Sequence, residues 1–265
     1  MNKKIAIIGG GNLGQAIAEG LVKSGFTEAG HILVTRRRID QIKHLEGKGM
    51  LVGDDNLEAV RFADLVVLAV KPFQVREVLS SIAPALDPDH HILCSVVTGI
   101  TLADMAAITG PGQPLVRAMP NTAIAIQESM TCLCSAHLTG DQAKYIEDLF
   151  NQLGRVVTIE EKLMDAATVL GACGIAYALR FIRANIQGGI EIGFDAQTAT
   201  LIAAQTVKGA AQLLIQTGRH PEQEIDKVTT PKGCTIAGLN EMEHQGFSSS
   251  LIKGITASYE KLGHR

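Results

Sequence analysis

Residues 5–14 read IAIIGGGNLG, and this stretch decides the fold of the chain. Its first four residues are apolar, as expected of a parallel strand that is buried on both faces. Gly9, Gly11 and Gly14 then follow with G-x-G-x-x-G spacing. Every fourth position of residues 13–21 is aliphatic, which predicts an amphipathic helix. Strand, glycine turn and helix in this order predict an α/β chain with a Rossmann-type dinucleotide-binding domain.

Each glycine has a physical role in such a turn. Gly9 permits the tight reversal, Gly11 lets the backbone approach a pyrophosphate, and Gly14 allows the helix to pack closely on the strand. The helix N-terminus, at Asn12 and Leu13, then offers free N–H groups to the phosphates. We therefore expect these residues to bind a dinucleotide. The alternative is a glycine-rich loop that simply begins an α/β domain.

The composition narrows the possible partners. The chain has 265 residues, of which 46% are hydrophobic, and its formal net charge is -3. These values argue against a nucleic-acid or anionic-membrane surface. No apolar stretch is expected to reach the roughly 20 residues that span a bilayer. The five cysteines are scattered, so we interpret them as reduced thiols of a cytoplasmic protein and expect no metal site.

The cofactor preference is predicted from the end of the second expected strand, residues 31–35. NAD-binding folds usually place an acidic residue here to hold the ribose 2′-hydroxyl. This chain instead has Thr35, Arg36, Arg37 and Arg38. Guanidinium groups suit a 2′-phosphate, and the segment has no carboxylate to repel it, so we expect NADPH to be favoured over NADH. The alternative is a solvated basic patch that begins the next helix.

Further buried strands are predicted from apolar runs along the N-terminal part of the chain. In an open α/β sheet, ligands bind outside the carboxyl ends of the strands. The runs expected to form strands are residues 63–70, 91–97, 114–119, 130–134 and 156–159, with a short helix over 102–108. The residues that we expect to line the cofactor at these strand ends are Ala69, Val70, Lys71, Pro72, Thr98, Gly99, Met119, Pro120 and Asn121.

The pattern changes near residue 160. From 162 to 215 alanine and glycine alternate with aliphatic residues at helical spacing, and strand signals are absent. Helices that are apolar nearly all round need more than one packing partner, so we expect burial between subunits. The predicted domains are residues 1–160, which bind the dinucleotide, and residues 161–265, an all-α helical dimerisation domain.

A separate turn precedes a helix near the end of the chain, where residues 228–239 read VTTPKGCTIAGL. Thr230 is expected to cap this helix and Pro231 to lie in its first turn. Such a terminus offers N–H groups to an anion, for example a substrate carboxylate. The alternative is an ordinary helix start.

Together these motifs resemble those of the pyrroline-5-carboxylate reductase family, over essentially the whole chain. The matching motifs are IIGGGNLG (7–14), Asn56, LAVKP (68–72), SVVTGIT (95–101), RAMPNT (117–122), GACGIAY (171–177) and TTPKGCTIAGL (229–239). The resemblance implies hydride transfer from NAD(P)H to the imine carbon of 1-pyrroline-5-carboxylate, which gives L-proline. It also implies a homodimer with interlocked helical domains, which family members often assemble into decamers.

The resemblance also assigns residues. It implies that Asn56 lies near the adenosine ribose and that Met119 to Asn121 lie near the nicotinamide. The final loop, with Thr230, Gly233 and Cys234, is implied to hold the substrate carboxylate on backbone N–H groups. Thr235 matches the threonine that hydrogen-bonds the ring nitrogen.

Two departures from the family pattern leave other functions open. Lys232 stands where the family's SPGGTT loop has its first glycine, and residues 171–177 replace the usual SGSGPAY. Lysine at this position requires either an ordinary φ at residue 232 or a pocket reshaped for another substrate. The alternative functions are reduction of another cyclic imine or small keto compound, and a non-catalytic NADP-binding role.

Overall fold

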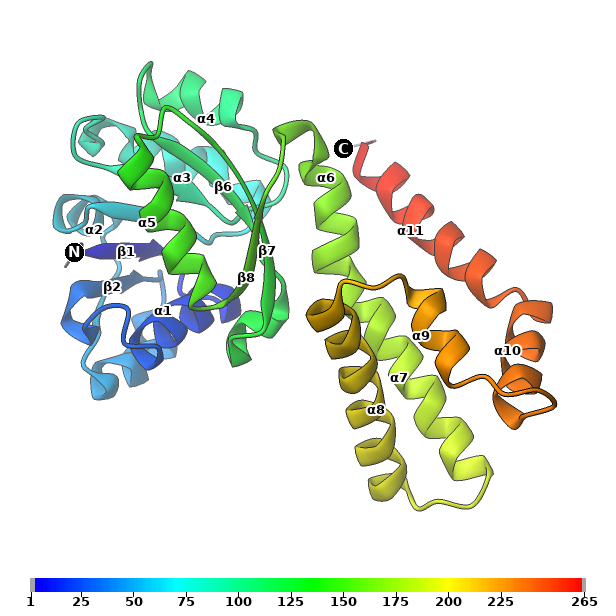
Figure 1. Ribbon diagram of the computed structural model, residues 1–265. Helices are drawn as coiled ribbons and strands as arrows, with labels where there is room; N and C mark the ends of the chain where they lie inside the picture. Colours follow the sequence, from blue (N-terminus) through cyan, green and yellow to red (C-terminus); the bar gives the residue numbers. More distant parts are fainter. Residues whose placement is uncertain (1–2, 264–265) are drawn as a thin grey trace. The chain divides into compact units, whose positions relative to one another are not determined.

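The computed structural model describes residues 3–263. The chain divides into two compact units, Met1–Cys173 and Gly174–Arg265. The N-terminal unit is an α/β fold, and the described residues of the C-terminal unit contain helices and no strand (Figure 1). This arrangement confirms the predicted fold class, while the boundary expected after residue 160 stays a prediction.

Within residues 3–263 the strands form one eight-stranded sheet, in the order β3-β2-β1-β4-β5-β6-β7-β8. The strands are β1 (Ile5–Ile8), β2 (Ile32–Thr35), β3 (Leu51–Gly53), β4 (Leu65–Leu68), β5 (Ile92–Ser95), β6 (Leu115–Met119), β7 (Ser129–Ala136) and β8 (Gly154–Thr158). All neighbours are parallel except β6 and β7, which are antiparallel. The order reverses between β1 and β4, which is the topological switch point where doubly wound folds bind ligands.

Helices cover both faces of the sheet, and β1 shows why its sequence is apolar without alternation. Ile5 and Ile7 pack in a core cluster with α1 and α5, whereas Ala6 and Ile8 pack in a second cluster with α2, α3 and α4. Every residue of β1 is therefore buried. The helices of this unit are α1 (Asn12–Lys23), α2 (Asn56–Phe62), α3 (Val75–Ile82), α4 (Leu102–Thr109) and α5 (Gly140–Asn151).

The predicted strands are all present, with ends displaced by at most two residues, but β3 was not predicted. It has three residues at the edge of the sheet, and its Leu51 is 42% exposed. A short strand at the sheet edge is less buried than a central strand, so it lacks the continuous apolar run that marks the central strands.

The C-terminal unit continues the helical segment that begins near residue 161. The last elements of the N-terminal unit are α6 (Met164–Ala167) and the π-helical turn Thr168–Cys173. The helices of the C-terminal unit are α7 (Gly174–Glu191), α8 (Ala196–Thr217), α9 (Pro221–Lys227), α10 (Cys234–His244) and α11 (Phe247–Gly263). Asp195 caps α8 by accepting the N–H groups of Gln197 and Thr198 at 2.9 and 3.0 Å.

The start of α10 differs from the prediction. Gly233 is the N-cap and the helix begins at Cys234, so Thr230 does not cap it and Pro231 lies before its first turn. The Gly233 N–H donates to the Thr230 carbonyl at 3.0 Å, which closes a separate turn ahead of the helix. Lys232 supports this turn with a left-handed φ of 59°.

Large apolar side chains remain exposed on the helices of the C-terminal unit. Leu179 on α7 is 59% exposed and Leu201 on α8 is 71% exposed. The run Glu161–Glu191 is also long and apolar enough to cross a membrane by length and composition alone. The expectation that no apolar stretch reaches this length was therefore wrong, because interleaved Ala and Gly keep the run apolar without a block of large residues.

Candidate dinucleotide site

A groove of about 910 Å³ lies at the carboxyl ends of the central strands, within the N-terminal unit. Its volume is in the range of natural cofactor sites, roughly 300–1,000 Å³. The structure brings these predicted residues together in the groove lining: Gly9, Gly11, Asn12, Leu13, Thr35, Arg36, Arg37, Asn56, Ala69, Val70, Lys71, Pro72 and Thr98.

The three glycines of the first turn have different surroundings. A Cβ on Gly9, where φ is 114°, would lie 2.5 Å from the Ala69 carbonyl oxygen, and a Cβ on Gly14 would collide with the Gly9 carbonyl oxygen. Around a Cβ on Gly11 nothing lies within 4 Å. Gly9 and Gly14 are thus required by packing, while the space beside Gly11 is open for an approaching phosphate.

Helix α1 presents its N-terminus to this groove. Gly11 is its N-cap and supplies no side-chain acceptor, so no cap covers the first N–H groups, which begin at Asn12 and Leu13. The first hydrogen bond of the helix runs from the Gln15 N–H to the Gly11 carbonyl, at 2.9 Å. Uncapped N–H groups with the positive end of a helix dipole behind them fit a pyrophosphate.

At the basic corner of the groove, two side chains make hydrogen bonds within the protein that the sequence did not indicate. The Arg36 guanidinium donates to the Gly10 carbonyl at 2.5 Å, and the Thr35 hydroxyl donates to Asn56 Oδ1 at 2.6 Å. Arg37 is exposed on the lining. These contacts give Arg36 a partner within the protein, whereas Arg37 presents its charge to solvent at the groove.

A carboxylate also lines the groove, from outside the segment 35–38 in which the sequence has none. Asp54 lines the groove directly after β3, and β3 pairs with β2 at Thr35 and Gly53. The unpredicted edge strand therefore carries an acid to the arginines that close the neighbouring strand. The Asp54 side chain is exposed, so solvent screens its charge and it repels a bound phosphate only weakly.

Some predicted residues lie outside the groove lining: Gly14, Gly99, Met119, Pro120 and Asn121. Pro120 is buried and Met119 is 6% exposed, with its sulfur 4.0 Å from the Thr98 hydroxyl. The Asn121 side chain accepts the Ala123 N–H at 3.0 Å and donates to the Gly171 carbonyl at 3.4 Å. Of these residues, Met119 thus contacts a residue that does line the groove, Thr98.

Other lining residues were not predicted: Ile8, Gly10, Ala16, Arg38, Gln41, Asp54, Gln74, Val78, Val96, Val97, Thr122, Ile124 and Ala125. Val96 and Val97 follow β5 directly, so the strand-end rule that selected Thr98 would have selected them as well. Thr122 belongs to the RAMPNT motif. Arg38 follows the two predicted arginines, whereas Gln41 has no comparable sequence signal.

The predicted substrate residues Thr230, Gly233, Cys234 and Thr235 lie in the C-terminal unit at the start of α10. In this structure the Gly233 N–H donates to the Thr230 carbonyl, and its role in binding a carboxylate stays a prediction. Cys234 and Thr235 open the helix, which has no side-chain cap. The positive φ of Lys232 contradicts the first sequence alternative, an ordinary φ at this residue, while the second, a pocket reshaped for another substrate, stays a prediction.

Strand order, glycine turn and basic groove together define a dinucleotide-binding oxidoreductase of the doubly wound class. Residues 4–99 match the family described as "NADP oxidoreductase coenzyme F420-dependent", which agrees with this class. Residues 161–264 match the family described as "Pyrroline-5-carboxylate reductase dimerisation".

Full-length relatives identify the family. Pyrroline-5-carboxylate reductase 2 of Dictyostelium discoideum is 47% identical, with 98% of this chain and 92% of the relative covered. The soybean (Glycine max) pyrroline-5-carboxylate reductase is 35% identical, with 97% and 94% covered. The chain belongs to the pyrroline-5-carboxylate reductase family.

Solved structures agree with this assignment. The pyrroline-5-carboxylate reductase of Coxiella burnetii has a TM-score of 0.92 at 29% identity, with 100% of this chain and 98% of that chain covered. The Plasmodium falciparum pyrroline carboxylate reductase with NADP bound has a TM-score of 0.89 at 27% identity, with 98% and 97% covered.

Proposed function

We propose that this protein reduces 1-pyrroline-5-carboxylate to L-proline with NADPH. The observation that carries the proposal is 47% identity to a curated pyrroline-5-carboxylate reductase over nearly the whole chain. The dinucleotide groove in the N-terminal unit supports it independently, because a nicotinamide cofactor needs the uncapped N-terminus and glycine turn found there.

The residues of the groove bind and orient the cofactor, which when bound supplies the hydride. The N–H groups of Asn12 and Leu13 bind the pyrophosphate, and Asn56, already fixed by the Thr35 hydroxyl, holds the adenosine ribose. Arg37 binds the 2′-phosphate, which favours NADPH over NADH. Ala69 to Pro72 and Thr98 line the remaining wall. Gly99, Met119, Pro120 and Asn121 support the nicotinamide end.

The N-terminus of α10 binds the substrate. Cys234 and Thr235 donate their backbone N–H groups to the carboxylate, as the turn closed by Thr230 and Gly233 leaves them in the first helical turn. The Thr235 hydroxyl hydrogen-bonds the ring nitrogen. A protonated imine is already electrophilic, so positioning supplies most of the rate and no separate acid–base pair is needed.

The protein functions as a homo-oligomer built from dimers, either the dimer itself or a decamer. The match of residues 161–264 to a reductase dimerisation domain supports the dimer, and so do the exposed apolar side chains of α7 and α8. We attribute the apolar run Glu161–Glu191 to this interface rather than to a membrane. Free cysteines throughout the described residues suit a cytoplasmic enzyme.

The proposal is tested by following NADPH oxidation with 1-pyrroline-5-carboxylate and identifying the product. Formation of L-proline is the expected result. Turnover of other cyclic imines or small keto compounds but not of this substrate would indicate a related reductase. NADPH binding without turnover of any of them would indicate a non-catalytic paralogue.

A further inference from the structure

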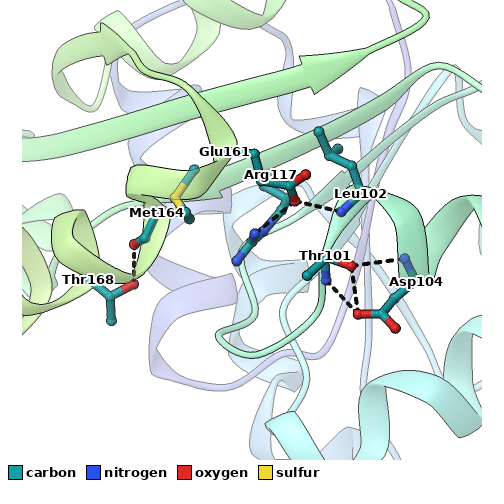
Figure 2. A network of polar contacts seen from close by, with 7 residues as sticks. All are labelled: Thr101, Leu102, Asp104, Arg117, Glu161, Met164 and Thr168. Carbon is teal, nitrogen blue, oxygen red and sulfur yellow. Dashed lines mark hydrogen bonds and ion pairs between the residues drawn. The ribbon is translucent and has the colours of Figure 1, made fainter. Parts of the chain in front are cut away.

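An ion pair in the N-terminal unit, between a buried arginine and a half-buried glutamate, has no part in the function described so far. Arg117 on β6 has a side chain only 6% exposed, and its Nη1 lies 2.8 Å from Glu161 Oε1 (Figure 2). The same carboxylate oxygen accepts the backbone N–H of Leu102 at 2.7 Å. One oxygen of Glu161 thus joins β6 to the first residue of α4.

The N-terminus of α4 is otherwise fixed by its own capping box. Thr101 and Asp104 exchange hydrogen bonds of 3.0 and 2.9 Å, and Arg76 from α3 pairs with Asp104 at 2.6 Å. This capping leaves the Leu102 N–H to Glu161, which reaches it from 59 positions away in the chain. A carboxylate at this end of a helix also interacts favourably with the helix dipole.

Glu161 is the anion that balances the buried Arg117 guanidinium. Cys134 is the ionisable neighbour on β7, but burial raises the pKa of its thiol to about 11, so it stays neutral. Within residues 3–263 the Arg117 Nε is buried without a hydrogen-bond partner, so the guanidinium depends strongly on Glu161. Removal of Glu161 is costly because the buried Arg117 charge is left uncompensated.

The pair lies between two functional segments. Leu102 follows the loop after β5, which contains Thr98, and Thr98 lines the cofactor groove and contacts Met119 of β6. Glu161 is the first residue matched by the reductase dimerisation family. Met164, one turn later, packs with Met119 and Cys134 in a separate buried cluster.

We propose that Arg117 and Glu161 are positioning residues for the reductase reaction, which hold the loop from Thr98 to Leu102 at the reactive end of the groove. This inference rests on the proposed function. Neither residue lines the cofactor groove, so both act through the Leu102 N–H and through β6. The adenosine half of the groove is built from other elements and does not depend on the pair.

The test is a double-mutant cycle with Glu161→Ala and Arg117→Met in the full-length protein, scored on kcat and on KM for NADPH. Each single variant is expected to lower kcat by about tenfold or more, with KM for NADPH changed by less than about threefold. The double variant is expected to lose no more than the worse single variant, because the two side chains act as one unit. The matched control is Glu160→Gln, since Glu160 forms an exposed pair with Lys162 next to Glu161.

Unchanged kcat in the single variants would overturn the proposal. So would a loss of kcat in the double variant that equals the product of the two single losses. A rise in KM for NADPH as large as the fall in kcat would also overturn it. Glu161→Gln keeps an oxygen acceptor, so it is expected to show a smaller loss of the same kind. It replaces Glu161→Ala in the cycle if that variant does not fold.

Absence of turnover in the wild-type protein would refute the proposed function separately. Hydrogen exchange of the backbone amides in residues 98–102 then tests whether Arg117 and Glu161 hold this loop in position. Faster exchange in Glu161→Gln than in Glu160→Gln supports it, and equal exchange contradicts it.

Discussion

At the scale of single residues, the three consecutive arginines are not equivalent. Arg36 is half-buried and holds the Gly10 carbonyl, which belongs to the glycine turn, whereas Arg37 is exposed at the groove. From the sequence alone, Arg36 and Arg37 are both expected to bind a 2′-phosphate. The structure separates a residue that supports the turn from one that is free to bind an anion.

Arg37→Ala is therefore expected to lower kcat/KM with NADPH by about tenfold and to leave kcat/KM with NADH nearly unchanged, since one charge-assisted contact is worth about 1.5–3 kcal/mol. Arg36→Ala is expected to lower kcat/KM with both cofactors because it loosens the glycine turn. Steady-state kinetics with each cofactor measure the difference. Arg155→Ala, an exposed arginine on β8, is the control. Equal losses with both cofactors in Arg37→Ala would contradict its assignment to the 2′-phosphate.

Lys232 takes a left-handed φ of 59° in the turn before α10. A residue with a Cβ is strained there by about 1–2 kcal/mol, whereas a glycine loses about 0.4–1 kcal/mol through the entropy of its unfolded chain. Lys232→Gly is thus expected to raise stability slightly, by up to about 1 kcal/mol, and to leave or improve turnover of 1-pyrroline-5-carboxylate. Thermal unfolding and kcat/KM measure this. A fall in turnover with unchanged stability would show that the ammonium itself acts on the substrate.

Thr235 lies in the first turn of α10. If its hydroxyl bonds the ring nitrogen, Thr235→Ala lowers kcat/KM by about ten- to a hundredfold, because one buried hydrogen bond is worth roughly 1–3 kcal/mol. Thr235→Ser keeps the hydroxyl and is expected to retain most of the activity. Wild-type rates in Thr235→Ala would place the substrate site elsewhere.

At the scale of elements, α4 shows how a capping box makes helix stability depend on pH. The hydrogen bonds from the Thr101 side chain and backbone, followed by the contact with Arg76, lower the pKa of Asp104 from 3.8 to about 2. The ionised form is therefore favoured in the folded state. Its contribution is complete above the unfolded pKa near 3.8 and is lost as the pH falls toward 2.

Asp104→Asn is accordingly expected to lower the Tm near neutral pH by about 2–4 °C, equivalent to about 1 kcal/mol for one helix cap. The gap between variant and wild type is expected to shrink as the pH falls from about 4 to about 2, because the wild-type carboxyl becomes protonated there. Thermal unfolding followed by circular dichroism over this range measures both values. A constant gap across the range would show that charge has no part in this cap.

The elements also show what the sequence could and could not predict. Central strands such as β1 and β4 are buried on both faces, so their sequences are continuous apolar runs that predict strands. The edge strand β3 has an exposed Leu51 and no such run, and with it the acid at Asp54 was missed. The start of α10 was misplaced because local preferences of Thr230 and Pro231 do not reveal the turn closed by Gly233. The contact between Glu161 and Leu102 depends on tertiary structure and leaves no local pattern.

At the scale of the whole molecule, the two units differ in how they bury apolar residues. The N-terminal unit has continuous core clusters on both faces of its sheet. In the C-terminal unit, by contrast, Ala199 and Ala203 are the residues of α8 that are buried, and none of α7 is buried. A helical unit with so little core of its own gains most of its burial from a partner.

The wild-type protein is therefore expected to behave in light scattering as a dimer or a multiple of a dimer at micromolar concentration. Leu201→Glu places a charge on α8 at a side chain that is 71% exposed in the single chain, so it is expected to shift the protein toward monomers. Each buried leucine contributes about 1.5–3 kcal/mol and occurs once in each copy, and a buried carboxylate adds a desolvation cost. Leu51→Glu, at a 42% exposed leucine of the N-terminal unit, is the matched control and is expected to leave the assembly intact. A monomeric wild type, or equal dissociation in both variants, would exclude the C-terminal helices as the interface.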